Sequence, residues 1–387
     1  MNTIRCKALD GSSPLHFLAA LGLLRLAEHV VPGATLGWSM AEGVWNPTLG
    51  LDEEQDIFIR KVVDWMKLAA SVGDANPILR RAVEKCKTDL KKLKEQFKQV
   101  RQQVRRETSR RGLRGDEKQR FENEYSKPIA EAIAAKAREL ESAHLQLAAA
   151  YGDGIAHYGE VIGVAPSIVR SRGESAAKAF LATPMGVSPE ATAEGFLVSH
   201  LPALACDQVT DGGKAVPTRF SFGNGAGGQA LLKDWRNLAS RVTIEHMQAT
   251  FVGSDARIIE ETTGLNWDPS ANRSYALNWD NPETIPKRTD VAANALAYVG
   301  LGLLTAMPVE GRLKAIGWGP EDEWTWPLWA PSLRVNVVRS LLAHAVLMRD
   351  RIAPGWMAAN GIMEVRRSQR IDPSGQGRPY FSPSMVV

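Results

Sequence analysis

The N-terminal part of the chain shows a helical pattern of apolar positions. Apolar side chains recur every three or four residues from Leu15 to Leu26. Ser12 and Ser13 precede this run and supply an N-cap, and Pro14 suits the first turn of a helix. The pattern therefore predicts a helix that starts at Pro14 and ends near His29.

A longer apolar series begins further along the chain. Residues Gly33–Gly50 are predicted to be loop or short strand, and a second helix is predicted from Asp52 to about Gly73. From Leu79 to Val104 the apolar positions then alternate at spacings of four and three over almost four heptads. This spacing is typical of a coiled-coil seam.

The segment after this seam predicts the second arm of a hairpin. Gly112 and Gly115 interrupt the heptads, and another apolar stripe continues to Ala150, with Pro128 predicted to break or kink its helix. We predict an antiparallel helical hairpin whose tip is Arg105–Gly115. Its arms would be about 45 Å long at 1.5 Å rise per residue.

Beyond Gly152 the pattern changes to short apolar runs separated by Gly, Pro, Ser and Thr, which favours short strands and short helices. The elements predicted there are a strand over Val216–Phe222, a glycine loop over Gly223–Gly228, and helices over Gln229–Val242, Asp290–Leu304 and Leu333–Leu347. The fold class predicted is α+β, a mixed body with short strands and a helix-rich C-terminal part, plus the long basic hairpin as a coiled-coil insertion. The predicted division is 1–74 for the N-terminal part of the body, 75–151 for the hairpin, 152–285 for the body with the glycine loop, and 286–387 for the helical, Trp-rich C-terminal region.

Charge is distributed very unevenly along the 387 residues. The whole chain carries a net charge of +4, but the segment 80–127 holds 17 basic and 8 acidic side chains, an excess of nine positive charges. The remainder is therefore mildly acidic, with a net charge of −5. A concentrated basic segment on an acidic body is typical of contact with a polyanion.

Composition excludes several classes of protein. The three cysteines are too few and too far apart for a disulfide framework or a zinc cage. The N-terminus lacks the apolar stretch of a signal peptide, and no run of about 18 uncharged apolar residues occurs. We expect a cytoplasmic protein with no membrane contact.

Sequence signatures of catalysis are missing. Gly212-Gly213-Lys214 is followed by Ala215, where a Walker A motif needs a hydroxyl, and the seven histidines are scattered singly. Cys206, next to Asp207, is most simply a buried thiol on a helix. We expect no catalytic residue, no metal and no cofactor.

One glycine-rich segment matches a cofactor fingerprint. Gly223–Gly228 (GNGAGG) satisfies G-x-G-x-x-G between a predicted strand and a predicted helix, with Glu245 about 20 residues on. The fingerprint normally opens the first βαβ unit of a parallel sheet, and nothing near residue 260 reads as its second buried strand. Backbone contact with another phosphate, or a plain turn, remains the alternative to a bound dinucleotide.

The tip and first arm of the hairpin concentrate the basic side chains. Arginine recognises phosphate oxygens and guanine edges with a planar fork, whereas lysine acts as a point charge. Phe97 is the one aromatic residue between Arg80 and Arg120, which favours duplex over stacked single strands. A coiled coil that docks a protein, or a solvated face, is the alternative. The candidate nucleic-acid-binding residues are Lys91, Lys92, Lys94, Lys98, Arg101, Arg105, Arg106, Arg110, Arg111 and Arg114, with Arg219, Asn224 and Gln229 around the glycine loop.

Three blocks carry a resemblance to a known family. They are Asp10–Arg25 (DGSSPLHFLAALGLLR), Pro217–Gly225 (PTRFSFGNG), and Trp267-Asp268-Pro269 with Arg273 and Tyr275–Leu277. In order and rough spacing they resemble the large-subunit families of type I-U (I-G) CRISPR interference complexes. The resemblance implies a non-catalytic large subunit of a Cascade-type complex. Its partners would be target double-stranded DNA and its flanking motif, guide RNA, the CRISPR backbone subunits and a helicase-nuclease.

Two hypotheses of other classes stay open. One is an enzyme that binds a nucleotide at Gly223–Gly228, and the other is a scaffold whose hairpin docks a partner helix. Five tryptophans gather near the C-terminus. Because Trp324 and Trp326 alternate with polar residues, we predict that their rings share one face of a strip near the surface and contact a neighbouring subunit.

Overall fold

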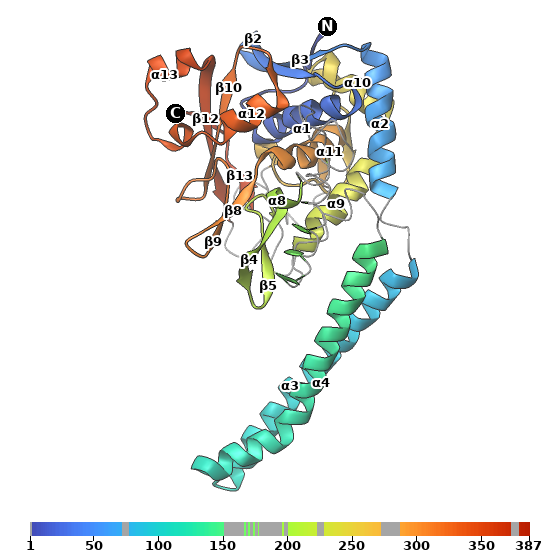
Figure 1. Cartoon of the computed structure of the whole chain (residues 1–387), viewed down its shortest axis with the longest axis vertical. Helices are drawn as coiled ribbons and strands as arrows, with labels where there is room; N and C mark the ends of the chain where they lie inside the picture. The colour runs from blue at the N-terminus through green and yellow to red at the C-terminus, as the bar shows by residue number, and fades with distance from the viewer. Residues whose placement is uncertain are drawn as a thin grey trace, which may run out of the picture. The chain divides into compact units, whose positions relative to one another are not determined.

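The computed structural model of the chain describes residues 2–71, 77–150, 200–222, 228–271, 287–372 and 379–387, together with isolated positions between 166 and 196. The chain forms two compact units (Figure 1). Unit 1 combines Met1–Val72 with Asp153–Val387, and unit 2 is Gly73–Gly152. Helices and strands both contribute to unit 1, which agrees with the α+β class predicted from the sequence.

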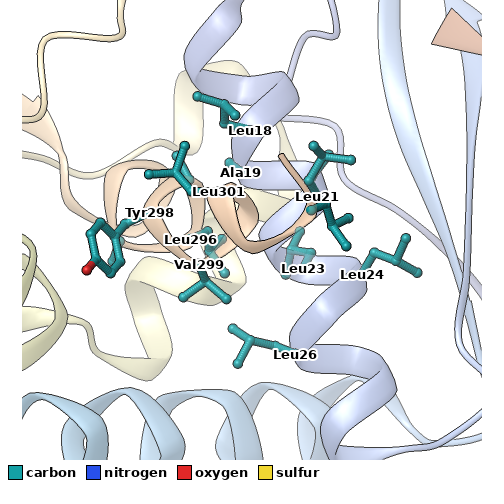
Figure 2. Packing of buried hydrophobic residues seen from close by; sticks show 14 of the residues in the cluster. Leu18, Ala19, Leu21, Leu23, Leu24, Leu26, Leu296, Tyr298, Val299 and Leu301 are labelled. Atoms are coloured by element: carbon teal, nitrogen blue, oxygen red, sulfur yellow. The ribbon is translucent and has the colours of Figure 1, made fainter. Parts of the chain in front are cut away.

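Two apolar helices form the centre of unit 1. The first is α1 (Pro14–Val30), which starts at the predicted proline and ends one residue after the predicted His29. The second is α11 (Val291–Gly300), which is capped because the Asp290 carboxylate accepts a hydrogen bond of 2.9 Å from the amide of Ala293. Every residue of α11 is buried, and the leucines of α1 interdigitate with it (Figure 2). Both predicted helices are confirmed, although the second ends at Gly300.

The two helices touch backbone to backbone at a pair of glycines. A Cβ atom on Gly22 would lie 1.9 Å from the carbonyl oxygen of Leu296, and one on Gly300 would lie 2.1 Å from that of Leu18. These distances are far below van der Waals contact. Glycine is therefore required at both positions for the helices to approach this closely.

Two antiparallel sheets flank this centre. The first has the order β1-β3-β2-β11 and contains β1 (Asn2–Arg5), β2 (Thr35–Ala41), β3 (Val44–Leu51) and β11 (Leu333–Arg334). The second contains β10 (Glu323–Trp329), β12 (Ile362–Ile371), β13 (Tyr380–Phe381) and β14 (Met385–Val386), with β12 pairing all three others. Residues predicted as loop or short strand thus form the β2–β3 hairpin, which turns at Glu42 and Gly43 with positive φ.

The remaining elements of unit 1 surround the core. The α-helices are α2 (Gln55–Ser71), α8 (Leu201–Leu204), α9 (Gly228–Arg241), α10 (Ile244–Val252), α12 (Val335–Leu342) and α13 (Pro354–Ala359). Strand pairs are formed by β4 (Ala205–Asp211) with β5 (Lys214–Pro217), β6 (Ile259–Glu261) with β7 (Arg288–Asp290), and β8 (Ala306–Val309) with β9 (Arg312–Ala315). Helices α2, α9 and α10 pack against one another or against α1 and α11.

Several sequence predictions are corrected here. In the described part of the region predicted as helical, 286–387, there are eight strands, β7 to β14, so this region is not mainly helical. The helix predicted over Leu333–Leu347 is limited to α12. The strand predicted over Val216–Phe222 ends at Pro217. Cys206 lies half-buried on β4 instead of on a helix. β11 pairs with the distant strand β2, whereas β4 and β5 pair with each other as a hairpin. In both cases strand pairing overrides the local helical pattern.

The tryptophans of β10 belong to the core. Trp324 and Trp326 are 0% exposed, and their rings stack with centroids 4.7 Å apart. The indole N–H of Trp326 donates a hydrogen bond of 2.9 Å to the carbonyl of Gly11, and Phe17 of α1 packs against both rings. The predicted surface strip is therefore wrong. The rings do share one side of the strand, but α1 covers that side.

Unit 2 consists of two long helices. They are α3 (Pro77–Arg110) and α4 (Gly115–Ala150), which lie side by side and are joined by a four-residue turn (Figure 1). Val83 is buried against Leu140 and Ala143 of the opposite helix, and Lys136 of α4 pairs with Asp89 of α3 at 3.7 Å. Helix α4 runs through Pro128 without interruption. Of the two predicted effects of this proline, the break is therefore wrong, and the kink stays a prediction.

A buried Arg–His contact links α1 to the residues before α8. Arg25 is 0% exposed, and its Nη1 lies 3.3 Å from Nδ1 of His200. Its guanidinium also donates to the carbonyls of Val299 and Phe196. Burial, and then the charge of Arg25, hold the pKa of His200 well below its ordinary value. Burial likewise lowers the pKa of His16.

These histidines predict loss of stability in mild acid. Because their pKa values are lower in the folded chain, the unfolded chain takes up protons first as the pH falls below about 6.5. Below that pH, each histidine should lower the free energy of unfolding of unit 1 by up to about 1.4 kcal/mol per pH unit. Above that pH, the full free energy of unfolding is retained. Urea unfolding at about pH 7.5 and 5.5 measures the effect. His200→Gln should flatten the dependence, and an unchanged pH slope in that variant would contradict the assignment.

Candidate nucleic-acid interface

Basic side chains are concentrated on one helix of unit 2. Helix α3 carries 12 basic and 4 acidic residues, whereas α4 carries 5 basic and 7 acidic residues. Five of the α3 cations are spaced alternately by three and four residues, which places them along one face of the helix. We call this set the basic stripe; its members are Lys91, Lys94, Lys98, Arg101 and Arg105, all exposed. The stripe extends over about 21 Å at 1.5 Å per residue.

The charges of the basic stripe are not neutralised within the part of the chain that the structure describes. No carboxylate there lies within 4.0 Å of a stripe nitrogen, although other cations of unit 2 are paired. Lys87, for example, pairs with Glu84 at 2.9 Å, and Arg111 pairs with Glu107 at 2.7 Å. The Arg111 hydrogen bond also lowers the pKa of Glu107. The stripe therefore offers unpaired charge, whereas the tip of the hairpin is partly self-neutralised.

A crevice of about 460 Å³ opens beside the distal end of the basic stripe. Arg101 and Arg105 line it from α3, and Lys118 lines it from α4. The hydroxyl-bearing residues of the lining are Thr108, Ser109 and Ser126. Glu122 is its one carboxylate and lies 3.9 Å from Lys118. The hydroxyl of Thr108 donates to the carbonyl of Arg105 at 3.0 Å, so the hydroxyl donors of the crevice are those of Ser109 and Ser126. Three cations against one carboxylate, with these hydroxyls nearby, suit a phosphate group.

The other candidates in unit 2 lie away from the stripe. Lys92 and Arg106 are exposed and each follows a stripe residue, so they project about 100° around the helix from it. Arg110 shares Glu107 with Arg111 at 3.3 Å, and Arg111 also lies 5.2 Å from the ring centre of Phe121. The last candidate here, Arg114, is exposed in the turn before α4.

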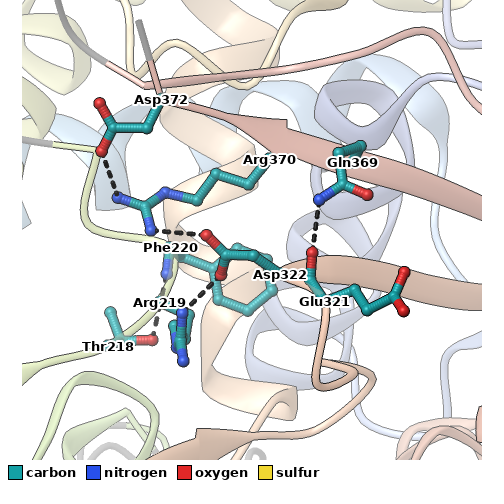
Figure 3. Close-up of polar contacts among 8 residues, drawn as sticks. All are labelled: Thr218, Arg219, Phe220, Glu321, Asp322, Gln369, Arg370 and Asp372. Atoms are coloured by element: carbon teal, nitrogen blue, oxygen red, sulfur yellow. Dashed lines mark hydrogen bonds and ion pairs between the residues drawn. The ribbon is translucent and has the colours of Figure 1, made fainter. Parts of the chain in front are cut away.

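The three candidates from the glycine-loop region belong to unit 1. Arg219 pairs with Asp322 at 2.5 Å, and Asp322 also pairs with Arg370 at 3.0 Å (Figure 3). The charge of Arg219 is thus partly balanced within the fold, while its side chain stays 39% exposed, and its contact with nucleic acid stays a prediction. Gln229 lies in the first turn of α9. Asn224, with the rest of Gly223–Gly227, lies outside the described residues.

The spacing of the basic residues in the sequence predicts the basic stripe, whereas a list of the basic residues alone does not. The alternation by three and four residues is visible in the sequence once α3 is predicted, and it separates Lys91 and Lys94 from Lys92. By contrast, the pairing of Arg219 with Asp322, 103 residues away, has no local signal. Within the described ranges, no group of three or more His, Cys, Asp or Glu residues is placed to hold a metal ion.

Comparison with family models, curated proteins and solved structures found no match to this chain. In the part of the chain that the structure describes, no helix is both long enough and apolar enough to cross a membrane.

Proposed function

We propose that unit 2 is a coiled-coil hairpin inserted into the α+β body and that it grips a nucleic-acid duplex through the basic stripe. The observation that supports this is a row of five unpaired cations along one exposed helix face. Neutralising phosphates with such cations releases condensed counterions, which supplies affinity without reading sequence. Successive stripe residues are about 5 Å apart along the helix, so several can contact one backbone together.

The arrangement favours a duplex over a single strand. Single-strand binding normally uses aromatic side chains on which bases stack. Phe97 is half-buried, and the guanidinium of Arg101 lies 5.8 Å from its ring centre. Tyr125, which is 50% exposed, lies on α4 and not on the helix that carries the stripe. A helix face of cations whose own aromatic ring is half-buried fits the regular phosphate array of double-stranded DNA.

The resemblance of the three sequence blocks supports a more specific role. We infer a non-catalytic, cytoplasmic large subunit of an RNA-guided, Cascade-type complex, which contacts target DNA and its flanking motif, stabilises strand opening and helps recruit a helicase-nuclease. Guide RNA and the CRISPR backbone subunits would be its partners. Two of the blocks pack together, since the indole N–H of Trp267 donates a hydrogen bond of 3.0 Å to the carbonyl of Phe220.

Two measurements test the proposed function. Fluorescence anisotropy of a labelled duplex of about 30 base pairs, titrated with the full chain between about 50 and 200 mM KCl, should give a steep salt dependence. Sequencing of RNA that co-purifies with the chain and the products of neighbouring genes should return guide RNA. Salt-independent binding, or a stoichiometric protein partner without nucleic acid, would favour the docking scaffold instead.

A matched pair of single variants tests the crevice. Arg105→Gln should weaken duplex binding by about tenfold, because a guanidinium beside two further cations makes charge-assisted hydrogen bonds to phosphate. Arg106→Gln removes the same charge from the next residue, outside the crevice, and should cost only about twofold. Anisotropy at fixed salt measures both. Equal effects would remove the crevice from the interface but leave the stripe in it.

A further inference from the structure

An apolar segment lies on the surface of unit 1. Its eight residues, Ile352–Ala359 (IAPGWMAA), include helix α13, carry no polar side chain, and are all at least partly exposed. A Cβ atom built on Gly355 meets nothing within 4 Å, so this side of α13 is open. Figure 1 shows α13 at the edge of unit 1, next to β12. We call these eight residues the α13 face. A continuous exposed apolar surface normally marks contact with a partner.

The α13 face is held in place by a small apolar cluster of its own. Ile352, Trp356 and Met357 are each half-buried against this cluster. The ring of Trp356 also lies 4.8 Å from the ring of His344. A face that is already fixed loses little conformational entropy when a partner binds. The buried members of the cluster are Leu347, Ile362 and Val365.

Trp356 is the member of the C-terminal tryptophan group that the core does not cover. Trp318, Trp324, Trp326 and Trp329 are buried, whereas Trp356 stays half-buried at the edge of the α13 face. Tryptophan is enriched among the residues that contribute most to protein–protein affinity. The contact that the sequence predicted for Trp324 and Trp326 therefore fits Trp356 better.

The charged residues beside the α13 face are mainly basic. Arg349 and Arg351 precede the face, are exposed, and form no ion pair within the part of the chain that the structure describes. Asp350 lies between them and pairs with Arg367 of β12 at 3.3 Å. Three guanidiniums against one carboxylate leave an excess of positive charge at this end of the face. Acidic residues on a partner would complement it.

We propose that the α13 face docks an amphipathic helix of another protein, whose apolar residues are flanked by glutamate or aspartate. Because the face is built on a helix and offers no strand edge, the partner packs as a helix. A second copy of this chain fits less well, since a symmetric contact would bring the arginines of both copies together. An anionic membrane fits less well, since α13 has no cations of its own along a polar face. This proposal does not rest on the function of unit 2.

Binding of synthetic peptides tests the proposal. The probe is a fluorescein-labelled peptide of about 18 residues with leucines at helical spacing and glutamates on both flanks. A second peptide has lysine in place of every glutamate. The full chain carries glutamine at all five stripe positions, so that the acidic peptide is not held by unit 2. Anisotropy should show saturable binding of the acidic peptide and binding of the basic peptide that is weaker by at least about tenfold.

Three variants of this parent chain locate the contact. Ala358→Glu places a carboxylate on the exposed side of α13 and should weaken binding by about tenfold or more, because the charge would be buried in an apolar contact. Ala134→Glu makes the same change at an exposed alanine of α4 and should alter the affinity by less than about twofold. Replacing Arg349 and Arg351 together with glutamine should weaken binding by about fivefold. The unfolding temperature of Ala358→Glu should match that of the parent, which separates lost binding from lost structure.

Other occupants are distinguished with the same proteins. Light scattering after size exclusion measures self-association, and co-sedimentation with phosphatidylserine–phosphatidylcholine vesicles measures membrane binding. A dimer that Ala358→Glu converts to a monomer, or vesicle binding that this variant abolishes, would overturn the proposal. So would equal binding of the two peptides, no saturable binding of the acidic peptide, or an Ala358→Glu variant that binds as well as Ala134→Glu.

Discussion

Replacing all five residues of the basic stripe with glutamine is expected to make the salt dependence of duplex binding much shallower. Each phosphate contact contributes about −0.9 to the slope of log affinity against log salt. Losing most of five contacts should therefore change the slope by about two to four, with the affinity falling by orders of magnitude at low salt. Anisotropy titrations of the full chain at several KCl concentrations measure both quantities.

Helix α3 offers a control with the same loss of charge. Five other exposed cations lie on a face roughly 140° around the helix from the centre of the stripe. They are Arg81, Lys85, Lys92, Arg106 and Arg110. Changing these to glutamine should alter the slope by less than half as much. If both sets reduced the slope equally, binding would follow total charge and not the stripe. If neither reduced it, the hairpin would be better explained as a docking arm for a protein.

Substitution of Gly22 is expected to have the largest effect on stability. In Gly22→Val, the new Cβ would overlap the backbone carbonyl of Leu296, which cannot rotate away as a side chain can. Helices α1 and α11 would have to separate, and both are buried along almost their whole length. We expect a loss of more than about 4 kcal/mol, which would unfold unit 1.

Gly355 provides the matched control for this prediction. It also lies in a helix, α13, but a Cβ atom built on it meets nothing within 4 Å. Gly355→Ala should therefore change stability by less than about 1 kcal/mol. Chemical unfolding followed by tryptophan fluorescence reports on unit 1, whose core contains Trp235, Trp324 and Trp326. A mild effect of Gly22→Val would show that the two helices can separate without loss of the core.

The sequence alone determined the elements whose signals are local. The helix spacing of apolar residues and the proline at position 14 locate α1, and the acidic residue at position 290 locates the start of α11. Heptad spacing likewise predicts α3, and the charges between its apolar positions contain the stripe. These features can be predicted from the sequence because an α-helix forms its hydrogen bonds within one segment. Residues spaced three and four positions apart therefore lie on one face of the helix.

The tertiary structure decided what depends on distant partners. From the sequence, Trp324 and Trp326 are predicted to lie on the surface, whereas in the structure α1 covers both rings. From the sequence, Arg219 is predicted to be an unpaired cation, whereas in the structure it pairs with Asp322. Arg5, His16 and Arg257 line one cleft but form no pattern within any short stretch of the sequence. Strand pairing, burial and ion pairing are set by residues far apart in the chain. Whether a charge is paired or a ring is covered therefore follows from the folded arrangement and not from any short stretch of sequence.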